Sequence, residues 1–166
     1  MNIDSSRLLV IKNKVKTLLE ENTLLKNEAS GAHYIGLKSA GDDPVFGQKE
    51  TELKLRQLPL PIDVVLLGMG EDGHIASLFP GLADTQNAMS ETNKQLCHPV
   101  RRGDNDVNRM TMTLNVFLGA KQICLLFFGE KKLEVLENAV QEKTELLPVS
   151  FLIHQNQVPV SLYWAE

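Results

Sequence analysis

The residues whose types suit chemistry lie in one stretch, 62–81, which reads IDVVLLGMGEDGHIASLFPG. Asp72 and His74 are separated by a single residue, so a tight turn can place the carboxylate beside the imidazole. A carboxylate in that position sets the ring tautomer and raises its basicity, and a free imidazole titrates near neutral pH, at about 6.5. The stretch therefore predicts a catalytic turn with His74 as the base and Asp72 as its orienting partner.

Three glycines, Gly68, Gly70 and Gly73, lie in six residues around this pair. Glycine adopts positive φ easily and lets a ligand approach the backbone. Two other interpretations stay open: a glycine-rich strand-to-helix turn with a surface histidine, and a dinucleotide-binding fingerprint. The fingerprint fits poorly, because Pro80 stops a helix that should be long and no strand precedes the nearest acidic candidate, Asp84.

The elements around the turn explain how it would be positioned. Residues 63–67 form a short apolar, β-branched run that ends at Gly68, which is typical of a parallel strand buried on both faces. A short helix is expected at 73–78, stopped by Pro80 and Gly81. The turn would then lie at the carboxyl end of a strand, where open α/β sheets bind their ligands.

The rest of the chain alternates between expected helices and strands. Helices are predicted at 1–21, 46–58, 114–120 and 130–141, with a short polar helix or loop at 24–31 and a turn or short helix at 147–154. Strands are predicted at 33–37, 123–128 and 158–164. Residues 82–108 are predicted to be a long polar loop, and the helix at 46–58 is expected to bury Phe46, Leu53 and Leu58. Together these elements predict one domain over 1–166 of the α/β class, with a Rossmann-like, mostly parallel sheet and helices on both faces.

Composition excludes several classes of protein. Hydrophobic residues make up 43% and charged residues 23% of the chain, the formal net charge is −4 and the pI is about 5.6. These values are ordinary for a globular protein, and without a basic block we expect neither nucleic acid nor a membrane as a partner. Cys97 and Cys124 lie far apart without metal-ligand spacing, so we expect both thiols to be reduced and buried, in a cytoplasmic protein.

The string GMGEDGHIASLFPG at 68–81 resembles the signature of the 6-phosphogluconolactonases, and a similar turn occurs in the related glucosamine-6-phosphate deaminases. In the deaminases the segment continues Phe-Asn-Glu-Pro, with a glutamate that belongs to the site. Residues 77–80 read Ser-Leu-Phe-Pro here, without that glutamate, which favours the lactonase branch over an isomerase or deaminase. Arg109-Met110-Thr111 resembles the Arg-Ile-Thr segment of the family, and 129–132 resembles its Gly-x-x-Lys.

The resemblance implies hydrolysis of 6-phospho-D-glucono-1,5-lactone to 6-phosphogluconate, a step of the pentose phosphate pathway that needs no metal or organic cofactor. His74 would activate water for attack on the lactone carbonyl. Backbone N–H groups from Gly70 to Gly73 would bind the oxyanion or the phosphate, and Arg109 and Lys132 would hold the phosphate.

The resemblance covers nearly the whole chain but not a whole family protein. The Ser-Gly-Gly-Ser-type phosphate loop and the Asp-Glu-Arg motif of the family are absent, and Ser6 stands where the family has asparagine. We therefore expect the C-terminal portion of the fold, with N-terminal strands missing and an exposed sheet edge that favours oligomerisation. The alternative to a lactonase is then an inactive remnant that binds a sugar phosphate or a partner subunit.

Overall fold

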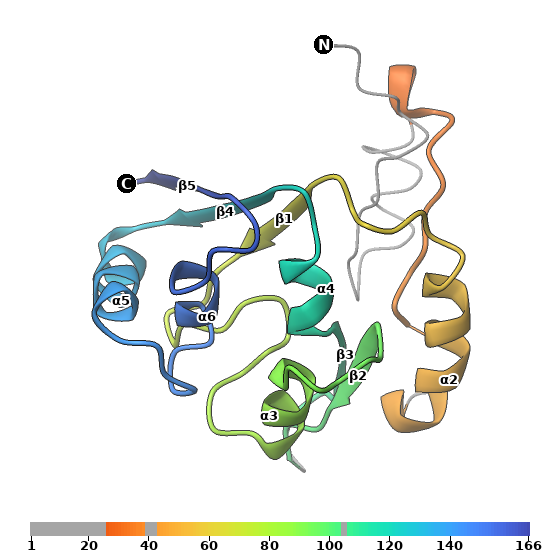
Figure 1. Cartoon of the computed structure of the whole chain (residues 1–166), viewed down its shortest axis with the longest axis horizontal. Helices are drawn as coiled ribbons and strands as arrows, with labels where there is room; N and C mark the ends of the chain where they lie inside the picture. Colours follow the sequence, from red (N-terminus) through yellow and green to blue (C-terminus); the bar gives the residue numbers. More distant parts are fainter. Residues whose placement is uncertain (1–25, 39–42, 104–105) are drawn as a thin grey trace.

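A computed structural model describes residues 26–38, 43–103 and 106–166 (Figure 1). The helix expected at 1–21 and the position of Ser6 lie outside these residues. The strands are β1 (Val65–Gly68), β2 (Cys97–Val100), β3 (Arg109–Met112), β4 (Ile123–Phe128) and β5 (Val160–Ala165). The helices are the short 3₁₀ turn η3 (Asn27–Ala29), α2 (Pro44–Leu55), α3 (Ala83–Met89), α4 (Leu114–Leu118), α5 (Glu130–Gln141) and α6 (Ser150–Ile153).

The main sheet has the order β1-β4-β5, and both strand pairs are parallel. β4 is the central strand, and its run ICLLFF alternates between fully buried and less buried positions. The glycine after it, Gly129, starts α5 at a positive φ of 87°, so the chain leaves the carboxyl end of β4 and enters a crossover helix. A parallel sheet joined by helical crossovers confirms the predicted α/β class.

A second, antiparallel ribbon is made by β2 and β3, which pair from Cys97↔Met112 to Val100↔Arg109. It packs against α2 and α3, below the main sheet in Figure 1. Helix α3 and the first strand of the ribbon, β2, both lie within the segment 82–108 that the sequence predicts to be a loop, so that prediction is wrong. α3 is short and largely hydrophilic, so this segment of the sequence shows no clear helical repeat of apolar residues.

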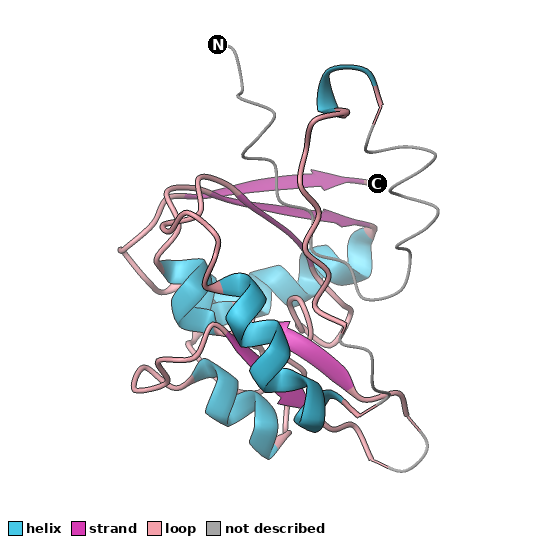
Figure 2. Ribbon diagram, turned by 90° about the vertical axis from the view of Figure 1, so that its right-hand side faces the viewer, coloured by secondary structure: helices cyan, strands magenta, loops and turns pink. Residues whose placement is uncertain are grey.

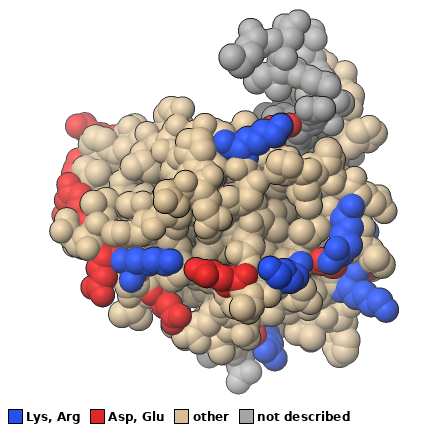
Figure 3. Space-filling view, viewed as in Figure 1, with Lys and Arg blue, Asp and Glu red and all other residues tan. Residues whose placement is uncertain are grey.

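The described α-helices lie on one side of the three-stranded sheet in both ribbon views (Figures 1 and 2). On the opposite face the register pairs Leu66 with Cys124 and Leu126 with Tyr163, and Leu66 and Tyr163 are 68% and 54% exposed. Space-filling atoms coloured by charge show a belt of alternating acidic and basic side chains below the strands, whereas the surface over them is mostly uncharged (Figure 3). None of the described helices is long and apolar enough to cross a membrane.

Several local predictions need correction. The helix predicted at 73–78 is a tight turn with isolated bridges, because Gly73 and Ala76 have positive φ, which an α-helix does not allow. The segment 33–37 has no assigned strand. The helix predicted at 46–58 forms at Pro44–Leu55, and it buries Gly47, Thr51 and Leu55, while Leu58 beyond its end is partly buried against the core. Phe46 and Leu53 are exposed, because the ribbon packs against the small-residue face.

Candidate active site

The predicted catalytic turn begins directly after β1. Met69 and Ile75 form an antiparallel bridge, and both side chains are buried, which anchors the base of the turn in the core. Inside the turn, the Gly70 N–H donates to the His74 carbonyl at 2.9 Å, and the Gly73 N–H donates to the Gly70 carbonyl at 3.1 Å. These bonds close a compact loop whose polar residues face away from the core.

Asp72 and His74 are brought together as predicted. The distance from His74 Nδ1 to Asp72 Oδ1 is 2.5 Å, and the His74 backbone N–H donates to the same oxygen at 3.1 Å. Because a carboxylate only accepts, Nδ1 carries the proton, which leaves Nε2 with a lone pair. Among the described residues no hydrogen bond engages Nε2, and the His74 side chain is 31% exposed.

The same contacts set the charge of Asp72. Partial burial raises the pKa of Asp72, but the hydrogen bonds from the backbone N–H and the ring of His74 outweigh burial and hold that pKa below its ordinary value. Asp72 is therefore ionised at neutral pH and can stabilise an imidazolium on His74.

The imidazole is enclosed on two sides. A Cβ added to Gly70 would lie 2.2 Å from both Nδ1 and Cε1 of His74 and 2.6 Å from the carboxylate of Asp72, so only glycine fits beneath the ring. The Phe79 ring packs next to His74, with 4.6 Å between the ring centroids and a tilt of 40°. Gly70 and Phe79 together restrict the imidazole to one orientation.

Two other segments support the turn from outside. The Val149 N–H, just before α6, donates to the Gly73 carbonyl at 3.0 Å, and Leu147 packs so closely on Gly73 that a Cβ there would lie 2.8 Å from its methyl group. On the other side, the Ser77 N–H contacts Thr111 Oγ1 of β3 at 3.4 Å. Residues far apart in the sequence therefore hold the turn in place.

The predicted substrate-binding residues come from the turn itself and from two other elements, α5 and β3. The N–H groups of Gly70 and Gly73 are bonded to carbonyl oxygens inside the turn. Lys132 lies in the first turn of α5, and it is the neighbouring Lys131 that reaches the catalytic turn, with its Nζ 4.0 Å from Glu71 Oε2. A substrate-binding role stays a prediction for Gly70, for Gly73 and for Lys132.

Arg109 begins β3, and its side chain is half-buried. The opposite strand ends at Val100, its partner across the ribbon, so the two arginines that follow, Arg101 and Arg102, lie at the same end of the hairpin. A phosphate-binding role for Arg109 stays a prediction, and its position two residues before Thr111 places it on the strand that supports the turn.

Sequence reasoning misses two residues near the turn. In the sequence Phe79 belongs only to the motif string, and Arg102 lies in the segment predicted to be a loop. The guanidinium carbon of Arg102 lies 4.1 Å from the centre of the Phe79 ring, on a side chain that is 27% exposed. The motif string contains Phe79, but nothing in the sequence relates Arg102 to it, because the contact depends on how the hairpin folds over the turn.

Cys97 is another side chain near these elements that could act as a nucleophile, and the structure excludes that role. Burial, and then the nearby charge of Glu52, raise the pKa of the Cys97 thiol to about 12, so the thiol stays protonated. Cys97 is buried as predicted, whereas Cys124 is only partly buried on the open side of the sheet, and both are free thiols. No group of three His, Cys, Asp or Glu side chains within the described residues is arranged to hold a metal ion.

The fold and the site together define a class: an α/β protein with an Asp–His pair on a glycine turn at the carboxyl edge of a parallel sheet. Comparison with known proteins narrows this class. The family model described as glucosamine-6-phosphate isomerases/6-phosphogluconolactonase matches residues 12–164. The chain therefore belongs to this family.

Curated relatives include the 6-phosphogluconolactonase of Pseudomonas aeruginosa, which is 34% identical over 142 residues, covering 85% of this chain and 58% of the relative. The 6-phosphogluconolactonase of Mesorhizobium japonicum is 32% identical, with 86% and 59% covered. The chain thus spans less than two thirds of the length of these relatives. Among solved structures, a 6-phosphogluconolactonase from Shewanella baltica superposes with a TM-score of 0.88 at 30% identity, covering all of this chain and 75% of the other.

Proposed function

We propose that this chain hydrolyses 6-phospho-D-glucono-1,5-lactone to 6-phosphogluconate, with His74 as the general base. The observation that carries the proposal is the 2.5 Å contact between Asp72 and His74, which leaves Nε2 open to a water molecule. Membership of the family supplies the substrate class. The sequence Ser-Leu-Phe-Pro at 77–80 supports the lactonase over the deaminase, because the glutamate of the deaminases is absent.

The reaction follows from the ring atoms. His74 Nε2 takes a proton from water as the water oxygen attacks the lactone carbonyl, which gives a tetrahedral oxyanion and an imidazolium. Asp72 stabilises the imidazolium through Nδ1–H. When the intermediate collapses, the bond between the carbonyl carbon and the ring oxygen breaks, and the imidazolium returns the proton to that oxygen. The products are the open-chain carboxylic acid, which releases its proton to solvent to become the carboxylate, and a neutral His74, ready for another cycle.

The rest of the proposal concerns binding and location. Arg109 and Lys132 contact the phosphate of the substrate, as a planar fork and as a point charge. The free thiols Cys97 and Cys124 support a reducing compartment such as the cytoplasm. Within the described residues β1 is an outer strand of the sheet, which supports oligomerisation through that edge.

The decisive experiment measures release of 6-phosphogluconate from the lactone by the purified protein, after subtraction of uncatalysed hydrolysis. His74→Asn is expected to lower kcat by about 10²–10⁴-fold, since it removes the only base in contact with Asp72. His33→Asn is the matched control, because His33 is an exposed histidine outside the turn. Thermal unfolding of both variants should match the unsubstituted protein.

Three outcomes separate the candidates. Turnover that survives in a folded His74→Asn variant would refute the assignment of the base. Binding of 6-phosphogluconate without turnover in the unsubstituted protein would favour the inactive remnant. Release of ammonia from glucosamine 6-phosphate would favour the deaminase. Measurement of the intact mass of the protein from its own cells, against 18.5 kDa for this chain, tells which length of polypeptide was assayed.

A further inference from the structure

Arg102, Phe79 and His74 form a row of three side chains. Phe79 lies in the middle, with its ring centre 4.1 Å from the guanidinium carbon of Arg102 and 4.6 Å from the centre of the imidazole. Phe79 therefore contacts both a permanent cation and the imidazole proposed as the general base. The row crosses from the turn after β1 to the loop after β2, so it exists only in the folded chain.

Contact with the Phe79 ring uses none of the N–H donors of Arg102. A guanidinium has five such donors in its plane. The ionic contact given by the described residues is with Asp106, at 3.3 Å, and the Asp106 side chain is 52% exposed. An exposed ion pair of this kind is weak and is easily exchanged for a stronger anion.

The preceding residue shows the opposite arrangement. Arg101 donates to Asp84 through Nε at 2.8 Å, Nη2 at 2.7 Å and its backbone N–H at 2.9 Å, and the Asp84 side chain is only 9% exposed. Its charge therefore anchors the loop to α3. Because Arg101 fixes the loop, Arg102 is not needed to hold the loop in place.

We propose that Arg102 is a further substrate-binding residue, which contacts the phosphate of the sugar substrate while Phe79 keeps the guanidinium and the imidazole at a fixed spacing. This inference rests on the proposed function for the identity of the substrate. Arginine suits the role because its planar fork binds two phosphate oxygens at once, and a dianion competes well with a single exposed carboxylate. Phe79 is then a positioning residue that acts on both neighbours.

The kinetic test compares Arg102→Gln and Arg102→Lys with the unsubstituted protein. Arg102→Gln is expected to raise KM for the lactone about 10–100-fold, the cost of losing a charge-assisted contact. Its kcat should change by less than about threefold, because the contact is made equally before and during the reaction. Arg102→Lys should recover part of the loss. Arg56→Gln is the control for charge, since Arg56 is exposed and lies on α2.

A binding measurement separates this inference from the proposed function. Calorimetry with 6-phosphogluconate should show a similar 10–100-fold loss of affinity for Arg102→Gln, whether or not the protein turns over lactone. If turnover fails but this loss is found, the inference stands and the proposed function falls. If Arg102→Gln has unchanged KM and unchanged affinity, the inference is overturned, whatever the activity. Gluconate, which lacks the phosphate group, tests whether Arg102 contacts the phosphate. An equal loss of affinity for gluconate in Arg102→Gln would overturn the assignment of Arg102 to the phosphate.

Phe79→Leu tests whether Phe79 positions Arg102 and His74. The aliphatic side chain keeps apolar contact with the core but removes the flat surface for Arg102 and for the imidazole. We expect kcat to fall and KM to rise together, with Phe79→Tyr close to the unsubstituted protein in both. A folded Phe79→Leu variant with unchanged kcat and KM would show that the row does not position either group.

Discussion

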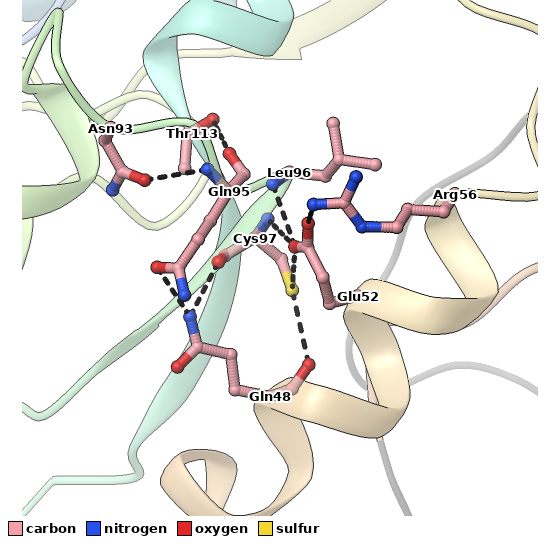
Figure 4. A network of polar contacts seen from close by, with 8 residues as sticks. All are labelled: Gln48, Glu52, Arg56, Asn93, Gln95, Leu96, Cys97 and Thr113. Carbon is pink, nitrogen blue, oxygen red and sulfur yellow. Dashed lines mark hydrogen bonds and ion pairs between the residues drawn. The ribbon is translucent and has the colours of Figure 1, made fainter.

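Two polar regions of this molecule are built around a carboxylate that accepts hydrogen bonds from the backbone, and only one of them suits chemistry. In the turn after β1, Asp72 accepts from the N–H and ring of His74. Between α2 and β2, Glu52 accepts from the N–H groups of Leu96 and Cys97 at 2.8 and 3.1 Å, and from Arg56 at 2.8 Å (Figure 4).

The difference lies in what remains unpaired. The Glu52 network ends in groups that bond each other or the backbone, and the Glu52 side chain is only 14% exposed. The turn ends in His74 Nε2, which the described residues leave open, beside an Asp72 side chain that is 48% exposed. A saturated network stabilises the fold, whereas a network with one open basic atom at the surface can act on a substrate.

Asp72→Asn should give the largest change in this comparison. The amide presents an N–H to Nδ1, so the imidazole carries its proton on Nε2 and can no longer accept one from water. We expect kcat to fall about 10³-fold, with little change in the denaturant midpoint, because Asp72 is half exposed. A kcat close to that of the unsubstituted protein would show that the pair has no catalytic part.

Gly70→Ala should be next. The new methyl group would occupy the position now filled by the edge of the His74 ring, so the imidazole must move. A displacement of about 1 Å at a reacting group costs about 100-fold in kcat. Gly31→Ala is the control, because a Cβ at Gly31 meets nothing within 4 Å. Equal kinetics for the two variants would mean that the ring is not held where the structure places it.

Glu52→Gln tests the saturated network. The substitution keeps the shape but removes the charge and half of the acceptor capacity, which leaves a buried N–H of β2 or the guanidinium of Arg56 without a strong partner. We expect the free energy of unfolding to fall by about 1–3 kcal/mol, with kcat unchanged. Glu50→Gln on the same helix is the control, since Glu50 is exposed and, among the described residues, pairs with Lys54. A loss of kcat without a loss of stability would reverse the contrast between the two regions.

The Asp84–Arg101 pair should give the smallest effect, visible as a pH dependence. The side-chain hydrogen bond from Arg101 outweighs burial and lowers the pKa of Asp84 to about 2, from an ordinary 3.8. A carboxyl group whose pKa is lower in the folded protein adds stability above its ordinary pKa and loses it as pH falls through the folded value. We expect about 1–2 kcal/mol to disappear between about pH 4 and pH 2.

Asp84→Asn is the variant that isolates this contribution. Chemical unfolding at several pH values should show a shallower acid slope for Asp84→Asn than for the unsubstituted protein. The same slope in both proteins would mean that Arg101 does not hold the carboxylate in solution, and the loop that carries Arg102 would then lack its anchor.

The sequence alone predicted the central strand, the crossover helix after it and the Asp72–His74 turn. β4 and α5 have strong local signals, a continuous apolar run and an amphipathic repeat, and α5 starts and ends at the predicted residues. Asp72 and His74 are two residues apart, so their contact needs only a local turn, and the glycine beneath the ring is part of the same motif. Local order of this kind is encoded by nearest neighbours.

Only the tertiary structure decided which faces and which distant residues matter. α2 buries Gly47 and Thr51 instead of Phe46 and Leu53, because the ribbon packs closely on the small side chains. The pattern of hydrophobic residues along the sequence does not say which surface a helix will pack against. For the same reason the sequence does not predict the contact between Arg102 and Phe79. That contact joins two loops across the fold, and its free energy exists only once the hairpin has been placed beside the turn.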